Sequence, residues 1–349
     1  MPKLTDTIKR LLVILNPRSG WHDASNTFAA LVSETLDKSG VVHQVRQVPP
    51  EDLHDLLRSQ AKAGWEAVCV VGGSGSLNAY AHALTLPQFA SWREKPIMLV
   101  PSGIHNSLAN SLGLENAACS NASIISGGLK CVPLWKASVD GKLLSVALCG
   151  FNIGLFADAL LSSHKLRDWI NEYVSFPMVR RRNFWCTLYH IAKIDESRLR
   201  GSLRFVDANS GEVRAFPGGF LMVLASQARF HHPGYSLTPK AMFGKPKVGY
   251  TTRSDASMTM RLALTIASDT CERGRMMHLL LREGANGKVE ETDGVSMHEA
   301  SSVEFALRGD SAPRTLLLDG EESELMPGQT LRLVPTDVDL QFFVPQQTR

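Results

Sequence analysis

The sequence predicts an α/β protein of two domains. We expect a doubly wound parallel sheet with helices on both faces over residues 1–131, and a mainly antiparallel β-sandwich over residues 132–349. Three observations predict this arrangement. Apolar strands alternate with amphipathic helices in the first third of the chain, short strands separated by turn residues fill most of the rest, and 349 residues suffice for two cores.

The first third of the chain repeats a unit of strand, turn and helix. Apolar strands are expected at 10–15, 41–49, 66–71 and in the first half of 95–114, and helical patterns follow each of them. Because parallel strands place their following loops at one edge of the sheet, the loops after three of these strands should line a single crevice.

From about Cys131 the pattern changes to short strands. A hairpin is expected to turn at Asp140-Gly141, a helical section to cover about 158–196, and another helix to cover 269–283. Segments such as 329–335 and 339–345 are each expected to form a short strand.

The stretch 143–161 is apolar and about as long as a membrane span. Polar and glycine residues interrupt it, at Gly150, Asn152, Gly154 and Asp158. We therefore interpret it as a buried strand, a turn and the start of a helix, with a transmembrane helix as the alternative.

Bulk properties exclude several classes of protein. A net charge of +3 gives no reason to expect a nucleic-acid partner. The six cysteines are scattered without CxxC spacing, which predicts buried thiols in a reducing intracellular compartment. The N-terminus has no cleavable signal layout, so we expect a cytoplasmic protein, with membrane association or an uncleaved mitochondrial signal as alternatives.

The segment VCVVGGSGSLNAYAHAL (68–84) has the form of a phosphate-binding turn. Three glycines in four positions separate an apolar strand from a helix that begins near Leu77. Glycine permits a tight bend, and the free N–H groups at the helix start favour an anion. The alternative is a purely structural turn, because a tight connection needs glycine whatever it binds.

Four motifs occur in order along the chain: NPRSG (16–20), GGSGSLN (72–78), PSGIHN (101–106) and LDGE (318–321). Together with GFNIGLFADA (150–159), they resemble the diacylglycerol kinase and sphingosine kinase superfamily of lipid kinases. The resemblance implies that the first domain binds ATP with Mg²⁺ and that a lipid enters at the cleft with the β-rich domain. The implied phosphate or nucleotide contacts are Asn16, Pro17, Arg18, Ser19, Gly20, Gly72, Gly73, Ser74, Gly75, Ser76, Gly103, Asn106, Asp319 and Glu321.

The chain departs from the family pattern at polar positions. Ser74 stands where the family has a loop Asp, Ala79 replaces a helical Glu, and Ile104 replaces a Thr. A serine hydroxyl carries no charge near neutral pH, so it neither attracts a divalent cation nor acts as a comparable base. Leu160 stands where sphingosine-type members carry an acid for the substrate amine, which disfavours a cationic lipid and leaves diacylglycerol or ceramide types open.

Two interpretations follow. The first is a divergent lipid kinase, with Ser74 and Asp158 as weak catalytic candidates and with magnesium held by Asp158, Asp319 or Glu321; we assign no metal ligand from the sequence. The second is a pseudokinase that binds lipid or nucleotide, or serves as a subunit of a larger assembly. The run Arg180–Arg182, beside Phe184 and Trp185, is interpreted as a solvated helix face, a phosphate site or a contact to an anionic membrane.

Overall fold

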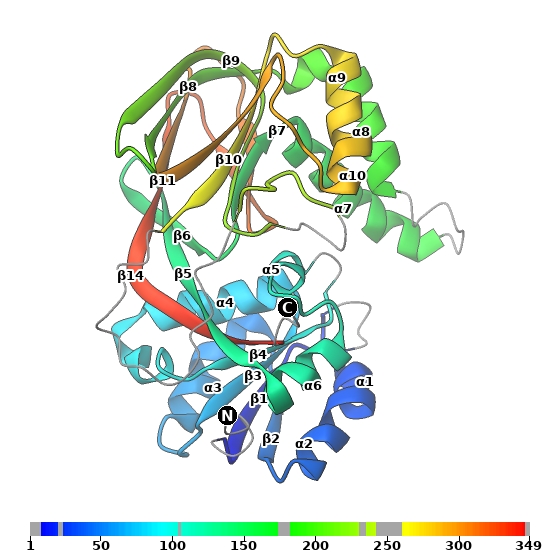
Figure 1. The fold of residues 1–349 in the computed structure, drawn as a ribbon, viewed down its shortest axis with the longest axis vertical. Helices are drawn as coiled ribbons and strands as arrows, with labels where there is room; N and C mark the ends of the chain where they lie inside the picture. The colour runs from blue at the N-terminus through cyan, green and yellow to red at the C-terminus, as the bar shows by residue number, and fades with distance from the viewer. Residues whose placement is uncertain are drawn as a thin grey trace.

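The computed structural model describes residues 8–19, 24–103, 106–173, 182–229, 235–241 and 260–345. In the N-terminal part, four parallel strands lie in the order β2-β1-β3-β4 (Figure 1). Their bounds are β1 Arg10–Leu15, β2 Val42–Gln47, β3 Ala67–Gly72 and β4 Ile97–Pro101. This confirms the predicted parallel sheet.

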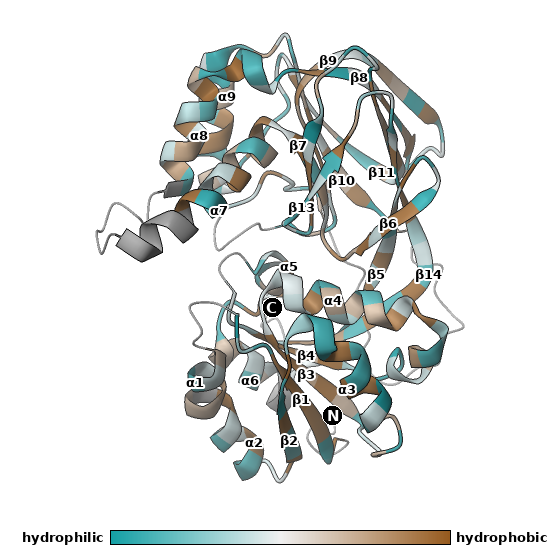
Figure 2. Cartoon of the chain, turned by 180° about the vertical axis from the view of Figure 1, so that it is seen from behind, coloured by the Kyte–Doolittle hydropathy of each residue, from teal (hydrophilic) through white to brown (hydrophobic). Residues whose placement is uncertain are grey.

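Each face of this sheet has its own core, because successive residues of a strand point to opposite faces. Leu12 and Ile14 of β1 pack in a cluster with helices α3 and α4, whereas Leu11 and Val13 pack in a second cluster with Phe28 and its neighbours. Figure 2 shows the apolar strands at the centre of this domain. Helices therefore cover both faces, as a doubly wound sheet requires.

The helical segments of this domain follow the predicted order. They are α1 Ala24–Phe28, the π-helical η2 Ala29–Ser33, α2 Glu34–Lys38, the 3-10 turn η3 Pro50–Asp52, α3 Leu53–Gln60, α4 Ser74–Thr85, the 3-10 turn η4 Pro87–Trp92, α5 Ser107–Ser111 and α6 Ala117–Ser126. Gly40, with φ of 68°, follows the turn that ends α2. A left-handed conformation there is one that glycine adopts without a Cβ penalty.

The C-terminal part is antiparallel, as predicted. Its strands are β5 Gly128–Val139, β6 Lys142–Ala147, β7 Gly150–Gly154, β8 Leu199–Asp207, β9 Val213–Ser226, β10 Leu262–Ser268, β11 Val295–Leu307, β12 Arg314–Leu318, β13 Glu321–Leu325 and β14 Thr330–Val344. They belong to one hydrogen-bonded network in which β8 pairs with both β9 and β11. The sheet therefore curls on itself and encloses a core. We expected two packed sheets, a β-sandwich, around this core.

Helices pack beside this curled sheet. They are α7 Leu155–Tyr173, α8 Arg182–Ala192, the 3-10 turn η6 Ile194–Ser197, α9 Arg273–His278, the π-helical η7 Leu279–Glu283 and α10 Gly284–Asn286. The stretch 143–161 forms strands β6 and β7 and the start of α7, as interpreted from its interruptions. Among the described residues, no helix combines the length and the apolar character needed to cross a bilayer.

Two strands connect the domains (Figure 1). β5 and β14 run antiparallel over most of their length, and Phe342 of β14 also pairs in parallel with Ile97 of β4. Segments 329–335 and 339–345 were expected as separate strands, but they form the single strand β14 with an irregularity between Pro335 and Asp339. The chain therefore returns to the first sheet near its end, and β5 runs without a break through the predicted boundary at 131/132.

Candidate functional site

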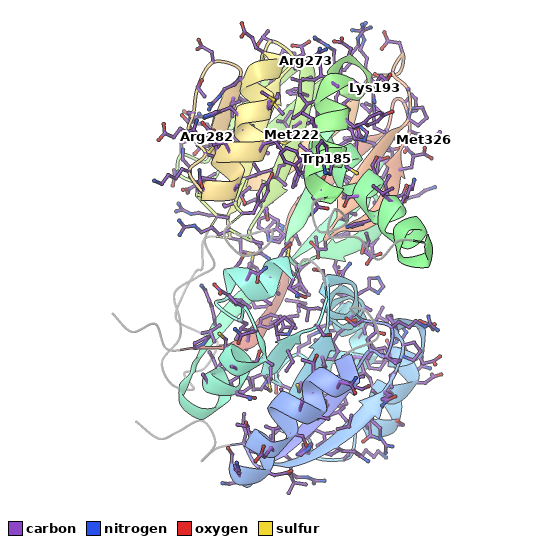
Figure 3. The ribbon with its side chains drawn as sticks, turned by 90° about the vertical axis from the view of Figure 1, so that its right-hand side faces the viewer. Trp185, Lys193, Met222, Arg273, Arg282 and Met326 are labelled. Carbon is purple, nitrogen blue, oxygen red and sulfur yellow. The ribbon has the colours of Figure 1, made fainter. Side chains whose placement is uncertain are left out.

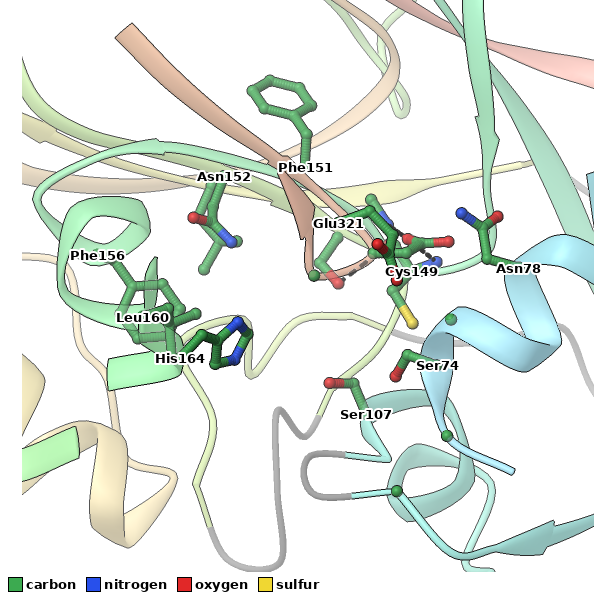
Figure 4. A pocket seen from close by; sticks show the side chains of 18 of the residues that line it. Ser74, Asn78, Ser107, Cys149, Phe151, Asn152, Phe156, Leu160, His164 and Glu321 are labelled. Atoms are coloured by element: carbon green, nitrogen blue, oxygen red, sulfur yellow. Dashed lines mark hydrogen bonds between the residues drawn. The ribbon is translucent and has the colours of Figure 1, made fainter. Parts of the chain in front are cut away.

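A cavity of about 990 Å³ lies where the two domains meet. The loops after β1, β3 and β4 form part of its wall, and β7, α7, α8, β9, η7 and the turn between β12 and β13 form much of the rest. Figure 4 shows Ser74 and Ser107 facing Cys149 and Glu321 across this space. The predicted crevice at the carboxyl ends of the parallel strands is therefore present.

The first loop is held to the glycine loop by the side chain of Asn16. Its amide Nδ2 donates a hydrogen bond to the Ser76 hydroxyl at 2.7 Å, and its Oδ1 accepts one from the backbone N–H of Arg18 at 2.9 Å. Ser102 donates to the Ser19 hydroxyl at 3.2 Å, which links the first and third loops. Asn16 and Ser19 thus shape the site whether or not they contact a ligand.

Arg18 supplies the one Lys or Arg side chain among the described cavity-lining residues. Its guanidinium pairs with Glu51 at 2.6 Å, and both side chains are more than half exposed. An exposed ion pair contributes about 0–1 kcal/mol, so an incoming phosphate can compete with Glu51 for this cation.

The glycine loop is built for backbone contact. Gly73 precedes α4, and a Cβ built on it would lie 2.9 Å from the Cα of Gly103. A Cβ on Gly103 would lie 2.4 Å from the Cα of Gly73. The two loops therefore touch through their backbones. The free N–H groups at the start of the twelve-residue helix α4 are left close to the cavity.

Asn106 organises the third loop in a left-handed conformation with φ of 37°. Its side chain donates to the Gly103 carbonyl oxygen at 2.7 Å and accepts from the Gly103 N–H at 3.1 Å. These bonds fix the loop beside Gly73. Asn106 is not among the residues that line the cavity, so its expected ligand contact stays a prediction.

Asp319 is a partly buried carboxylate with a structural task. Its oxygens accept hydrogen bonds from the backbone N–H groups of Leu148, Cys149 and Gly150 at 2.6, 2.8 and 2.8 Å. Burial raises the pKa of Asp319 to about 6, against the opposing effect of these three donors. These three bonds hold the chain before β7 in place. They also occupy the oxygens of Asp319, which leaves the carboxylate little capacity to bind a metal ion.

Glu321 lies against the first turn of α4. A Cβ built on Gly75 would lie 2.6 Å from Oε1 of Glu321, so the carboxylate fills the space that the glycine leaves open. A negative charge is favourable near a helix N-terminus. Glu321 from the second domain therefore contacts the glycine loop of the first.

Asp158 lies apart from the other candidates. Its carboxylate accepts a hydrogen bond from the Ser197 hydroxyl at 2.7 Å, and it is not among the described cavity-lining residues. Burial raises the pKa of Asp158, because desolvation outweighs the hydrogen bond from Ser197. Its hydrogen bond with Ser197 holds this carboxylate away from the cavity wall, so its catalytic task stays a prediction.

The predicted site residues divide into three groups. Those that line the cavity are Asn16, Arg18, Ser19, Gly73, Ser74, Gly75, Ser76, Gly103, Asp319 and Glu321. Pro17, Gly72, Asn106 and Asp158 do not line it. Gly20, Arg180 and Arg181 lie outside the described residues.

The wall on the side of the second domain is mostly apolar. Phe156, Leu160, Leu224 and Leu280 line it, and Ala79 faces the same cavity where the family has a Glu. Sequence reasoning missed most of this wall, because its side chains are scattered over α7, β9 and η7. Leu160 had been singled out through the family resemblance. A further signal was Asn152, a polar residue in an apolar run, which had been interpreted only as an interruption.

The described residues contain no cluster of three or more His, Cys, Asp or Glu side chains that could hold a metal ion. The acids in the cavity wall are Asp319 and Glu321, and three backbone donors already occupy Asp319. Mg²⁺ commonly binds through one or two carboxylates together with substrate phosphates. The donor set therefore fits a metal held mainly by a nucleotide, with Glu321 as the protein ligand.

Comparisons with known proteins agree with this architecture. Residues 10–136 match the model of the diacylglycerol kinase catalytic domain. The chain is 28% identical over 186 residues to sphingosine kinase 2 of Arabidopsis thaliana, covering 50% of this chain and 37% of that protein. It is 30% identical over 105 residues to sphingosine kinase 1 of Homo sapiens, covering 30% of this chain and 27% of that protein. The matched part thus spans little more than a third of these relatives at most.

A solved structure shares the fold over nearly the whole chain. A diacylglycerol kinase from Bacillus anthracis has a TM-score of 0.59 at 12% identity, covering 98% of this chain and 99% of that chain. At this identity the likeness establishes the fold alone. Part of the chain is thus similar to the catalytic domain of diacylglycerol kinases and to sphingosine kinases, and the chain shares the fold of the bacterial structure over nearly its whole length.

Proposed function

We propose that the chain binds ATP at its three loops and transfers the γ-phosphoryl group to the hydroxyl of a lipid. One observation carries this proposal: a single cavity joins the glycine loop to the apolar wall of the second domain. A lipid whose tail packs on that wall would present its polar end to the phosphates. The relatives named above are kinases, which supports the same reaction class.

The transfer would form a bond from the lipid oxygen to the γ-phosphorus and break the bond from that phosphorus to the β-bridging oxygen. ADP leaves, and the hydroxyl proton passes to water, because Ser74 offers no carboxylate. Phosphoryl transfer depends mainly on positioning and on neutralising charge. The helix α4 N-terminus, Arg18 and a metal held with Glu321 would supply that neutralisation.

A second candidate is a protein that binds the same ligands without phosphoryl transfer. Two observations favour it. Ser74 and Ala79 stand where the family has carboxylates, so the cavity wall lacks these two acids. The Asp319 carboxylate already accepts hydrogen bonds from backbone N–H groups. The fold needs only the glycines of the loop, so it would survive such a loss of catalysis.

Calorimetry with ATP, with and without Mg²⁺, and an ADP-release assay with a panel of lipid alcohols separate these candidates. Magnesium-dependent ATP binding with lipid-dependent ADP release supports the kinase. ATP binding without transfer supports the second candidate. Absence of binding at millimolar ATP overturns the assignment of the three loops to a nucleotide.

We propose further that the lipid reaches the cavity from a membrane surface beside α8. Phe184 lines the cavity and is 43% exposed, and its neighbours Trp185 and Tyr189 are 47% and 54% exposed. Figure 3 shows Trp185, Lys193 and Arg273 on one side of the second domain. Aromatic rings beside cations suit the interface of an anionic bilayer.

A further inference from the structure

We propose that Asn152 recognises the uncharged acyl linkage, an ester or amide group, of the lipid in this cavity. This inference rests on the proposed function, because it assigns one subsite of the same cavity. It starts from the strand β7, in which Phe151 and Ile153 belong to the core of the curled sheet. Since side chains alternate along a strand, Asn152 points to the opposite face.

That opposite face is the cavity wall. Asn152 lines the cavity, and its cross-strand neighbour Leu224 of β9 lines it as well. Figure 4 shows Asn152 in the same wall as Phe156, Leu160 and His164. An amide side chain is thus set beside Phe156, Leu160 and Leu224, whose side chains are suited to contact with hydrocarbon.

One atom of the Asn152 amide has no partner in the part of the chain that the structure describes. The residue is 8% exposed, and its Oδ1 is buried without a hydrogen-bond partner among the described residues. Buried polar groups are normally hydrogen-bonded, so an orphaned group that faces a cavity points to a ligand or a water as its partner. The two ends of an amide exchange by rotation of the side chain, so either a donor or an acceptor can face the ligand.

Neighbouring polar groups in the same wall are already paired. The Ser226 hydroxyl donates to the carbonyl oxygen of Cys149 at 3.1 Å, and the Tyr235 hydroxyl donates to that of Leu280 at 3.0 Å. The Asn183 side chain accepts a hydrogen bond from Ser163. Asn78 of α4 also lines the cavity with a buried Oδ1 that has no partner among the described residues, but it lies on the side of the first domain, near Glu321 (Figure 4). In the wall of the second domain, Asn152 is the amide that a ligand would satisfy.

The charge of the wall selects an uncharged group. The described acids that line the cavity, Asp319 and Glu321, lie at the turn between β12 and β13, next to the glycine loop. Leu160 of α7, by contrast, contributes only hydrocarbon to the wall around Asn152. A lipid ammonium would lose its hydration there without gaining a carboxylate, which is costly. An ester or amide group would instead form a neutral hydrogen bond with the Asn152 side chain.

The test measures direct lipid binding to the whole protein, independently of catalysis. The probes are dioctanoylglycerol, a short N-acyl amino alcohol, a long-chain alcohol without an acyl linkage, and a long-chain amine. Asn152→Leu keeps the approximate size and removes the amide. Asn152→Asp adds a carboxylate, and Asn209→Asp adds the same charge at an exposed turn of the second domain.

We expect Asn152→Leu to weaken binding of both acyl probes about tenfold, as the loss of one buried hydrogen bond implies, and to leave the plain alcohol unchanged. Asn152→Asp should strengthen binding of the long-chain amine relative to the acyl probes, whereas Asn209→Asp should leave this ratio of affinities unchanged. If Asn152→Leu changes the affinity for the acyl probes and for the plain alcohol equally, or changes neither, Asn152 does not recognise the acyl linkage. If the wild-type chain binds none of the lipids, the proposed function fails together with the inference.

Discussion

Gly73 and Gly103 bring the backbones of the second and third loops into direct contact. A side chain at either position would meet the main chain of the other, at 2.9 Å for Gly73 and 2.4 Å for Gly103. Backbone atoms cannot swing aside as the end of a long side chain can. The spacing between the two loops therefore depends on the absence of a Cβ at both positions.

The first prediction concerns this contact. Gly103→Ala should push the third loop away from the glycine loop, weaken ATP binding at least tenfold, and lower the free energy of unfolding by about 1–3 kcal/mol. Calorimetry and urea denaturation measure the two effects. Gly274→Ala in α9 is the matched control, because its Cβ would enter open space; it should leave ATP binding unchanged and should not lower the free energy of unfolding. Unaltered ATP binding by Gly103→Ala would show that the loop contact does not position the nucleotide.

The second prediction concerns the partly buried carboxylate of Asp319. Asp319→Asn keeps the shape but leaves at least one of the three backbone N–H groups facing an NH₂ group instead of an acceptor. We expect a loss of about 1–3 kcal/mol in the free energy of unfolding, measured by urea denaturation. Asp310→Asn, which removes an exposed ion pair with Arg308, should cost less than about 1 kcal/mol. Equal losses in the two variants would contradict the structural task of Asp319.

The third prediction follows from the pKa of Asp319, which burial raises from 3.8 to about 6. Between these values the folded protein keeps a proton that the unfolded chain has released. The folded state thus binds more protons, and the free energy of unfolding contributed by Asp319 falls as pH rises through this window. Urea denaturation across the window should show this fall as the difference between the wild type and Asp319→Asn. Parallel pH profiles would contradict the raised pKa.

The fourth prediction restores the missing acid of the glycine loop. Ser74→Asp places a carboxylate in the cavity wall beside α4, where it can hold a metal or accept a proton. If the chain is a kinase, lipid-dependent ADP release should rise about tenfold or more, since general-base catalysis contributes at least that much. Ser107→Asp puts the same charge elsewhere in the wall and should give no gain. Activity in neither variant nor the wild type would support the second candidate function.

The fifth prediction concerns the aromatic side chains of α8. Trp185→Ser should reduce sedimentation with phosphatidylserine vesicles and leave short-chain lipid binding in solution unchanged, because Trp185 is half exposed and does not line the cavity. Met326→Ser, at an exposed apolar residue outside α8, should retain vesicle binding. Vesicle binding that does not respond to Trp185→Ser would place the membrane contact elsewhere.

Local pattern was sufficient for most of the strands, the glycine turns and the hairpin at Asp140-Gly141, although β10 was not predicted. Apolar periodicity and turn residues act over a few positions, so these elements can be recognised from neighbouring residues alone. The same logic failed at β14. Residues 329–335 and 339–345 look like two strands, yet pairing with β5 on both sides of the irregularity makes them one.

The chemical site was predicted in outline. The loops that follow β1, β3 and β4 had to meet because parallel strands end at one edge. The hydrogen-bond partner of each acidic side chain could not be deduced in this way. Asp158 bonds to Ser197 and Asp319 to backbone N–H groups, and both arrangements depend on segments far away in sequence.

The sequence by itself determined that a parallel α/β domain precedes an antiparallel one and that glycines, not a carboxylate at position 74, form the second loop. Only the tertiary structure decided that Glu321 reaches Gly75 and that Asn152 lines a cavity with one amide atom that has no partner among the described residues. The physical reason is the range of the interactions. Backbone propensity and apolar periodicity are local, whereas burial and hydrogen-bond satisfaction depend on which distant segments the fold brings together.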